Sequence, residues 1–402
     1  MITGNDGYQN IFLARELFTV LFDNTANSIL TICPASVILL GDHTHYNEGV
    51  LISVCIDKYW ISLMRKRKDK EITIASTETN NISRFNLNEL EEKSDDQFKL
   101  LKGLLKILKD EGKLQHGFDC VVSSSVPECI GLGSLAAQQV GFLNCIKKLF
   151  SLDLNDEKLL SIVRRNELNH IGKISNIAHH YTVQHGKEKK IFVMDLRTKE
   201  HKTISFGNDE YSLVICDSGE RIIDPQKICN ERIEECEIGV KGLRLYIWGI
   251  KNLRDIKMEF LHQHIHMLPK RIFDRVLYNV KERIRAEEAI KYMRKKSLLE
   301  FGRTILDSHN DLSEDYDLSN EHCDYLVKES TKIGGVLCSK MISCSPIRST
   351  FNIVADGKVD QYINEIKNSY NQKFQKQLKT HVVKLSSGAK KIIFKDFELS
   401  LQ

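Results

Sequence analysis

The chain has 402 residues, of which 42% are hydrophobic and 28% are charged, a balance typical of a globular protein with core material for about two domains. Its 58 basic and 54 acidic residues leave a formal charge of +4, which is too small to indicate nucleic acid as the main partner. The same proportions exclude a disordered, collagen-like or coiled-coil chain.

The cysteines and the N-terminal residues indicate the compartment. The eleven cysteines form no C-x-x-C pair and several lie in apolar runs, so a disulfide framework, a zinc ribbon and a redox motif are not expected. The N-terminus lacks the pattern of a signal peptide, and no stretch approaches 18 uninterrupted apolar residues. We therefore expect a cytoplasmic protein without a membrane partner.

Taken in chain order, the hydrophobic pattern predicts mixed helices and strands. The first half begins with a helix over 8–23 and continues with strands, among them two short runs at 28–33 and 37–40 and a run over 50–65, before a helix over 133–150. From about residue 224 the pattern is mostly helical and closes with short strands. This mixed order predicts an α+β fold in two lobes, which we place at 1–215 and 216–402.

Two segments have a composition suited to binding. An apolar run ends at Gly41 and is followed by a polar turn containing Asp42, His43 and His45. Such a turn at a strand end can hold a small polar ligand, although composition alone favours a solvated turn. Further along, Gly131 and Gly133 precede a helix that begins near Ser134, an arrangement that binds anions in some proteins and is a simple turn in more of them.

These segments, in this order, resemble motifs of the galactokinase family in the GHMP small-molecule kinase superfamily. Residues 33–49, C-P-A-S-V-I-L-L-G-D-H-T-H-Y-N-E-G, are similar to the family segment A-P-G-R-V-N-L-I-G-E-H-T-D-Y-N-G-G. Residues 127–137, P-E-C-I-G-L-G-S-L-A-A, are similar to its phosphate loop, P-x-G-x-G-L-x-S-S-A-A. Further similar segments follow nearly to the C-terminus, among them V-M-D-L-R (193–197), C-N-E-R-I-E-E-C (229–236), L-R-D (253–255) and S-G-A (387–389).

The resemblance implies a two-lobed GHMP-kinase fold with a ligand cleft between the lobes, lined by 36–47, 127–137, 172–181 and 339–349. It implies ATP and Mg as cofactors and a sugar or related metabolite as ligand. The positions expected to bind the sugar are Asp42, His43, His45 and His179, and those expected to bind the nucleotide are Gly131, Gly133 and Ser134.

The positions that carry the family's chemistry are nevertheless changed. Ser36 stands where the family has an arginine that acts in phosphoryl transfer. Registered without a gap on Glu167 and Gly172, the family's catalytic aspartate falls on His179. The sugar-contacting tyrosine becomes Cys229, Cys129 and Ile130 enter the phosphate loop, and the third family motif, at 341–349, retains none of its glycines.

These losses predict impaired catalysis, because an arginine aimed at the transferred phosphoryl group contributes about 10³–10⁵ in rate and a general base about 10²–10⁴. The leading hypothesis is a pseudokinase that binds a sugar or metabolite and acts as a regulatory or scaffold protein, with a protein partner. The alternative is an active ATP-dependent kinase that phosphorylates galactose or a related sugar at the anomeric hydroxyl. In that case the rebuilt active site would consist of Asp42, His43, Ser134 and His179, with His179 as the base.

Two other patterns are weaker. His262, His264 and His266 alternate, but the flanking residues predict a helix, which spreads them around its axis, so no metal site is expected. The basic run over 65–70 is interpreted as a solvated hairpin end.

Overall fold

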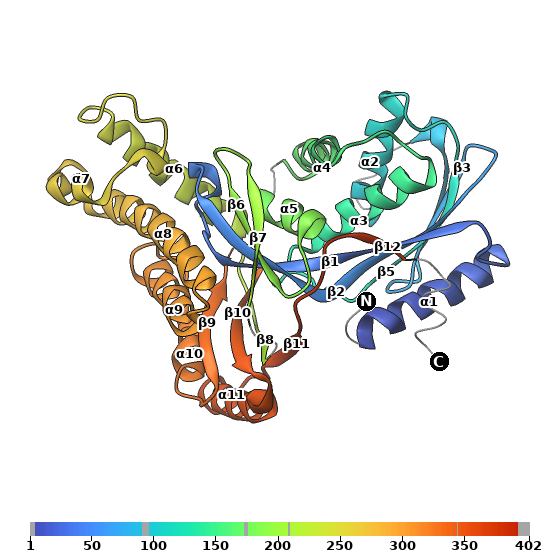
Figure 1. The fold of residues 1–402 in the computed structure, drawn as a ribbon. Coiled ribbons are helices and arrows are strands. Elements are labelled where there is room, and N and C mark those ends of the chain that lie inside the picture. Colours follow the sequence, from blue (N-terminus) through green and yellow to red (C-terminus); the bar gives the residue numbers. More distant parts are fainter. Residues whose placement is uncertain (1–4, 91–95, 173–175, 208–209, 344, 393–402) are drawn as a thin grey trace.

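The computed structural model describes residues 5–90, 96–172, 176–207, 210–343 and 345–392. They form two lobes, each built on its own β-sheet, with helices packed on the sheets (Figure 1). This confirms the predicted α+β, two-lobed architecture. None of the helices in these ranges is long and apolar enough to cross a lipid bilayer.

The larger sheet has eight strands. A six-strand path runs in the order β12-β1-β2-β5-β3-β4, and β6 joins it on β2 with β7 at its side. All pairs in this sheet are antiparallel except β3 with β5. The strands are β1 (Ser28–Leu40), β2 (Val50–Lys66), β3 (Glu71–Ser76), β4 (Ile82–Asn86), β5 (Phe118–Ser124), β6 (Lys190–Asp195), β7 (His201–Ser205) and β12 (Lys390–Ile392).

Helices cover both faces of this sheet (Figure 1). On one face, Ile11 and Phe18 of α1 (Asn5–Phe22) are fully buried against β1, β2 and β5. The other face packs against α2 (Lys99–Asp110), α3 (Ser134–Leu149), α4 (Asp156–Ile171) and α5 (Ile177–His185). Because β1 and β2 are buried on both faces, they read as continuous apolar runs in the sequence.

The smaller sheet is antiparallel, in the order β11-β8-β10-β9. Its strands are β8 (Tyr211–Arg221), β9 (Val336–Ile342), β10 (Ile347–Ala355) and β11 (Lys379–Val383). The helices of this lobe are α6 (Pro225–Leu243), α7 (Met258–Gln263), α8 (Lys270–Arg294), α9 (Leu298–Glu314), α10 (Glu321–Ser330) and α11 (Val359–Phe374). In Figure 1, α6, α7 and one end of α8 form an arm that projects from the body.

Single turns of 3₁₀ helix complete the fold, at His45–Asn47, Leu87–Glu89, Leu253–Asp255, Ile265–Met267 and Asp356–Lys358. The two lobes share a core in which apolar side chains of β1, β2, β8, β9, β10, α8 and α9 pack together. A lobe boundary at residue 215 would cut β8 and would separate β12 from its partner β1. One cut at residue 215 therefore does not separate the two sheets, and the lobe boundary placed there stays a prediction.

Two local expectations were wrong. The runs at 28–33 and 37–40 form one strand, because a register shift after Pro34 accommodates that residue within the pairing with β2. The basic run over 65–70 does not close a hairpin, because β5 lies between β2 and β3. In this connection Arg65 and Arg67 both form ion pairs with the buried Asp119.

Candidate ligand-binding cleft

The four segments expected to line the cleft meet between the two sheets. The Ser36 amide of β1 donates to the carbonyl of Leu132, just before α3, at 2.9 Å. The Ser349 hydroxyl of β10 donates to the carbonyl of Ile130, also at 2.9 Å. The turn after β1 contacts β9, and the first turn of α5 contacts β1. Lys173, Ile174, Ser175 and Cys344, which belong to the expected lining, lie outside the described residues.

Ser36 and His179 are in direct contact. Ser36 Oγ shares a hydrogen bond with His179 Nδ1 at 2.8 Å, and the Ser36 side chain is fully buried. His179 is positioned by the start of α5, where the Asn176 side chain accepts from the Ala178 amide and caps the helix. Desolvation of the imidazole, helped by neighbouring His180, lowers the pKa of His179 to about 4. At neutral pH the contact is therefore between two uncharged groups.

Gly133 lies directly against Ser36 and His179, with no room for a side chain. A Cβ on Gly133 would lie 2.6 Å from His179 Nδ1 and 2.9 Å from Ser36 Oγ. Gly133 also has φ +67 and precedes the first turn of α3, whose first residue is Ser134. Both the backbone conformation and the close approach require glycine here.

The loop before α3 keeps a glycine-type backbone although its first glycine is replaced. Cys129 has φ +64 and Gly131 has φ +81, both in the left-handed region. The side chain of Ile130, which we expected to obstruct a bound anion, is instead buried in the core shared by the lobes. Its apolar surface is thereby removed from water.

Asp42 is neutralised within the protein. Its carboxylate forms an ion pair with Lys340 of β9 and accepts a hydrogen bond from the Ser343 hydroxyl. Burial alone would raise the pKa of Asp42, but the Lys340 charge and these hydrogen bonds outweigh it and hold the pKa below its usual value. Both carboxylate oxygens are engaged within the protein, and the role of Asp42 in sugar binding stays a prediction.

Lys340 is completely buried and connects Asp42 to a second acid. Its Nζ donates to the Leu39 carbonyl at 3.1 Å and lies 3.7 Å from Glu282 Oε1 of α8. Glu282, also fully buried, accepts from the Gly41 amide at 2.7 Å and from the Ser308 hydroxyl at 2.8 Å. This cluster fastens the end of β1 to the C-terminal lobe.

His43 and His45 lie in the same turn and are uncharged at neutral pH. Burial lowers the pKa of His43 to about 3 and that of His45 to about 4. His43 Nδ1 lies 3.1 Å from the Tyr46 hydroxyl, which in turn lies 2.6 Å from the Tyr316 hydroxyl. Of the expected sugar-binding residues, His45 has a buried Nδ1 without a hydrogen-bond partner among the described residues.

A small cavity lies where segments expected to bind the sugar meet. It has a volume of about 10 Å³, room for about one water molecule. Its lining includes His43 from the turn after β1, Cys229 from α6, and Ser343, Ser345 and Arg348 around the turn between β9 and β10. The side chains present therefore close most of this space.

The chain's residues meet the needs of ATP and of Mg to different degrees. The left-handed loop and the N-terminus of α3 retain the backbone of an anion site. The nearby carboxylates do not provide a metal site, because Asp42 is ion-paired and Glu167 accepts from Gln139 and His180, each at 3.0 Å. The described residues contain no group of three potential metal ligands. The chain therefore fits a phosphate better than it fits Mg.

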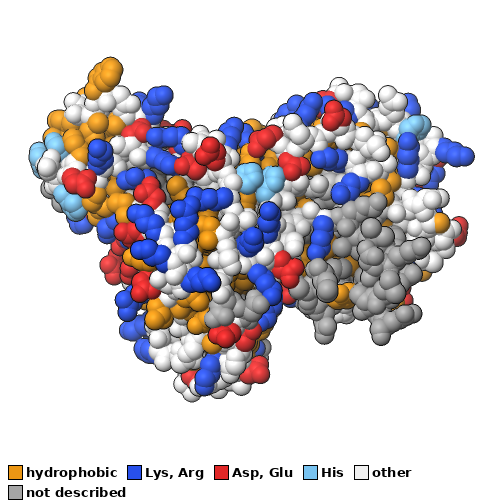
Figure 2. Space-filling model, viewed as in Figure 1, with side chains coloured by type: hydrophobic (Ala, Val, Ile, Leu, Met, Phe, Trp, Pro, Cys, Tyr) orange, Lys and Arg blue, Asp and Glu red, His pale blue; other side chains and the backbone are white. Residues whose placement is uncertain are grey.

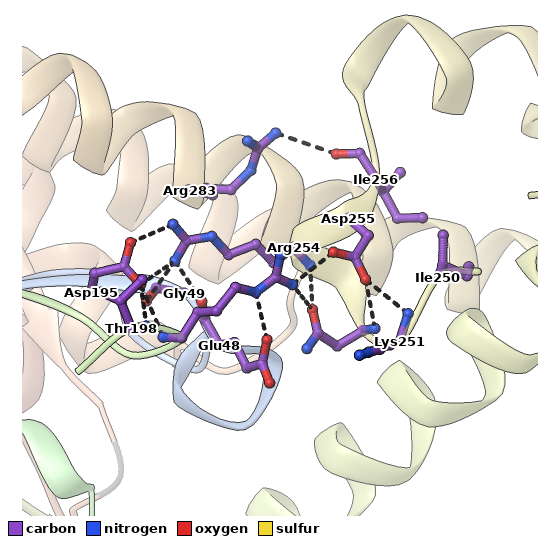
Figure 3. Close-up of polar contacts among 12 residues, drawn as sticks. Glu48, Gly49, Asp195, Thr198, Ile250, Lys251, Arg254, Asp255, Ile256 and Arg283 are labelled. Atoms are coloured by element: carbon purple, nitrogen blue, oxygen red, sulfur yellow. Dashed lines mark hydrogen bonds and ion pairs between the residues drawn. The ribbon is translucent and has the colours of Figure 1, made fainter. Parts of the chain in front are cut away.

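Two motifs that resemble the family scaffold form a clasp across the lobes (Figure 3). Arg254 binds both carboxylate oxygens of Asp195, with one contact at 3.0 Å, and donates to the carbonyl of Glu48 at 2.7 Å. Arg197 forms the reciprocal ion pair with Asp255 at 2.7 Å and also binds Glu48. The clasp holds the far end of the turn that contains the histidines.

Sequence reasoning missed Lys340 and the role of the clasp. A single lysine within the otherwise apolar strand 336–342 was the available signal, because a buried lysine requires a partner. The three alternating histidines do not share one helix: His262 lies in α7, which ends at Gln263, and His266 lies in the 3₁₀ turn that follows. His264, between them, stacks on Phe260 with ring centroids 3.9 Å apart.

Two family models match parts of the chain. The model "GHMP kinases N terminal domain" matches residues 99–186, which include the glycine loop and α3. The model "Galactokinase galactose-binding signature" matches residues 16–66, which include β1, the histidine-containing turn and β2.

Whole-chain similarity is to bacterial proteins named galactokinase. The chain is 27% identical to one from Clostridium beijerinckii over 96% of its own length and 100% of that protein. It is 28% identical to one from Fusobacterium nucleatum over 89% and 94%, respectively. Among solved structures, Lactococcus lactis galactokinase complexed with galactose superposes with a TM-score of 0.87 at 23% identity, covering 95% of this chain and 100% of that one. Methanococcus jannaschii mevalonate kinase superposes with a TM-score of 0.63 at 16% identity, covering 90% and 99%.

Proposed function

This chain belongs to the galactokinase family of the GHMP kinase superfamily, and we propose that it has lost efficient phosphoryl transfer and serves as a sugar-binding regulatory or scaffold protein. The observation that carries this proposal is the contact between Ser36 and His179, 2.8 Å apart. At the two positions where the family places an arginine and an aspartate, this chain has an uncharged hydroxyl and an uncharged imidazole.

The physical consequence concerns charge. Transfer of a phosphoryl group depends on neutralising the negative charge on that group and on removing a proton from the acceptor hydroxyl. Ser36 supplies no charge. His179, with a pKa of about 4, is a weak base, since proton transfer is favoured when the pKa of the base lies near the working pH. Both contributions are therefore reduced.

Binding of a sugar is supported by a different part of the chain. The galactose-binding signature model matches residues 16–66, and the similar Lactococcus lactis structure is complexed with galactose. In this chain Asp42 is engaged by Lys340 and Ser343, and the cavity holds about 10 Å³. A sugar would therefore enter only if the turn after β1 and the turn before β10 move apart.

An active kinase with a rebuilt site is the second candidate. One observation favours it: Cys129, Gly131 and Gly133 all keep the left-handed backbone of a phosphate-binding loop. In that case ATP would be the phosphoryl donor, and His179 would accept the proton of the sugar hydroxyl.

An assay of ADP release with Mg-ATP and a panel of hexoses separates the two candidates. Kinases turn over at about 1–100 s⁻¹, and loss of the arginine alone costs about 10³, so we expect turnover below about 0.1 s⁻¹ with every sugar. Turnover within about tenfold of ordinary kinase rates would contradict the impaired reading. The S36R/H179D variant, which restores the two family residues, is the matched comparison.

Ligand binding is measured independently of turnover. A ligand that binds the folded chain raises its apparent stability by mass action, so galactose and related hexoses are expected to raise the melting temperature. The matched control is R348A, which changes the cavity lining without altering Asp42, Ser36 or His179. A chain that no hexose stabilises would be a scaffold without a sugar ligand.

A further inference from the structure

An exposed apolar segment lies at the end of the arm. Immediately after α6, the chain reads Leu-Tyr-Ile-Trp over 245–248. The exposed fraction is 80% for Leu245, 53% for Tyr246 and 99% for Trp248. Single exposed apolar residues are ordinary on a protein surface, whereas neighbouring ones mark a contact site. We refer to Leu245, Tyr246 and Trp248 as the apolar knob.

Hydrogen bonds and apolar packing hold the loop that carries the knob. The Arg244 side chain donates to the carbonyls of Ile250 and Lys251, at 2.9 and 3.1 Å. The Asp255 carboxylate accepts from the Lys251 amide at 2.8 Å, and Ile247 packs against the core of the arm. The loop is thus closed on itself, with three of its four apolar side chains directed to solvent.

The position of the knob makes it convex. Figure 1 shows the connection between α6 and α7 at the far end of the projecting arm, and Figure 2 shows hydrophobic side chains on the outer surface of that arm. A stable interface between proteins covers about 800 Å² on each partner. Three neighbouring side chains on a protruding loop provide less than this.

Cations outnumber anions among the exposed residues that flank the knob in sequence. The exposed charged side chains that flank it in sequence are Lys241, Arg244, Lys251 and Lys257, against Glu237 and Glu259. Glu237 is ion-paired with Lys241 at 3.7 Å. The Asp255 carboxylate is already engaged by the Lys251 amide and by Arg197 of the clasp (Figure 3). An anionic surface would therefore be attracted to this end of the molecule.

We propose that the apolar knob inserts into the interfacial region of an anionic phospholipid bilayer. Tyr and Trp are the side chains enriched at membrane–water interfaces, where one end of the ring is apolar and the other is wet. A bilayer also needs no complementary pocket. Stable association requires two contributions, an apolar anchor and a basic patch, and the arm supplies both.

The proposal departs from the expectation of no membrane partner. That expectation rested on the charge of the whole chain and on the absence of a long apolar run. Neither property can detect an exposed apolar segment of only four residues. The association is peripheral, because no helix in the described ranges can span a bilayer. It rests on none of the cleft residues, so its outcome is independent of the proposed function.

The chain offers a built-in reporter of insertion. Its two tryptophans are Trp60 and Trp248, and Trp60 packs against the core of the N-terminal lobe. The W60F variant leaves Trp248 as the single tryptophan. We expect its emission to shift to shorter wavelength with phosphatidylcholine vesicles that contain about one third phosphatidylserine. Phosphatidylcholine alone and high salt should each abolish most of the shift.

Sedimentation with the same vesicles tests the two contributions separately. We expect L245S/W248S to lower the bound fraction about tenfold, and K251E/K257E to do the same at low salt only. The matched control is L299S, which removes an apolar side chain that is 68% exposed at the start of α9. It should bind as the unchanged protein does.

Three results would overturn the proposal. The first is an unshifted Trp248 emission with anionic vesicles. The second is equal sedimentation of L245S/W248S and the unchanged protein. The third is sedimentation without vesicles that L245S/W248S abolishes, which would assign the knob to contact between two copies of this chain.

Discussion

Ser36 Oγ and His179 Nδ1 share a hydrogen bond across 143 residues of sequence. They occupy the positions at which the family motifs place an arginine and an aspartate, and the contact shows that these positions face each other in the folded chain. By this resemblance the chain has a neutral pair where the family has two opposite charges, and the neutral pair satisfies its own hydrogen bond. The fold tolerates the change because a buried neutral pair avoids the desolvation cost of two ions.

Gly133 is predicted to resist replacement because it lies against Ser36 and His179. G133A puts a Cβ 2.6 Å from His179 Nδ1 at a left-handed position. We expect it to lower the free energy of unfolding by about 2–4 kcal/mol, from backbone strain and from overpacking. Urea titration followed by circular dichroism measures the change.

The matched control is G172A. Gly172 has φ +74, but a Cβ there meets nothing within 4 Å, so only the backbone contribution of about 1 kcal/mol remains. Equal costs for G133A and G172A would show that the close approach to Ser36 and His179 is not maintained in solution.

Lys340 is predicted to stabilise the fold through Asp42. K340M leaves a buried carboxylate without its cation, and we expect a loss of about 3–5 kcal/mol at neutral pH. K340M/D42N, which removes both charges, should recover much of this loss. A double variant as unstable as K340M would assign the effect to packing of the lysine stem.

The pH dependence of K340M follows from the same pair. In the unchanged protein the pKa of Asp42 is held below its usual value, so its stabilising contribution is present above about pH 4 and is lost as the pH falls further. Without Lys340, burial raises the pKa of Asp42. Protonation of Asp42 then stabilises K340M as the pH falls, the reverse of its effect in the unchanged protein. The deficit of K340M should therefore shrink as the pH is lowered from 7 toward about 4.

The three histidines of the cleft are predicted to make the protein less stable below neutral pH. Their pKa values are about 3 for His43 and about 4 for His45 and His179, whereas an unfolded chain has about 6.5. Between these values the unfolded chain binds more protons, so stability is full above about pH 6.5 and falls as the pH decreases.

Each histidine contributes a slope of up to about 1.4 kcal/mol per pH unit. Unfolding free energies measured between about pH 7.5 and about pH 5 give the total slope. Replacing His43, His45 and His179 by glutamine should flatten it in steps. A slope that is unchanged in the triple variant would show that these imidazoles are protonated in the folded chain.

Arg254 is predicted to act through its geometry as well as its charge. R254K retains the charge but cannot bind Asp195 with two donors while also reaching the Glu48 carbonyl. We expect R254K to lose most of the roughly 1–3 kcal/mol that R254M loses. Faster proteolysis between β1 and β2 would accompany both. If R254K were as stable as the unchanged protein, the charge at position 254 would account for its contribution, and the two-donor geometry would not matter.

Much of the fold could be predicted from sequence because it depends on local pattern. The apolar runs at 28–33, 37–40 and 50–65 predicted strands, Gly131 and Gly133 marked the start of α3, and the ordered motifs indicated the galactokinase family. The lost arginine and aspartate could also be located, because Pro34, Glu167 and Gly172 fixed the register on either side.

The environment of each side chain could be decided only by packing. The pairing of Asp42 with Lys340 joins residues 298 apart, and no local periodicity encodes such a distance. Ile130 is buried and Trp248 is exposed, although both are apolar residues beside a glycine or in an apolar run. Hydrophobicity along the chain determines how much surface must be buried, whereas the docking of the two lobes determines which side chains are buried and which are left in water.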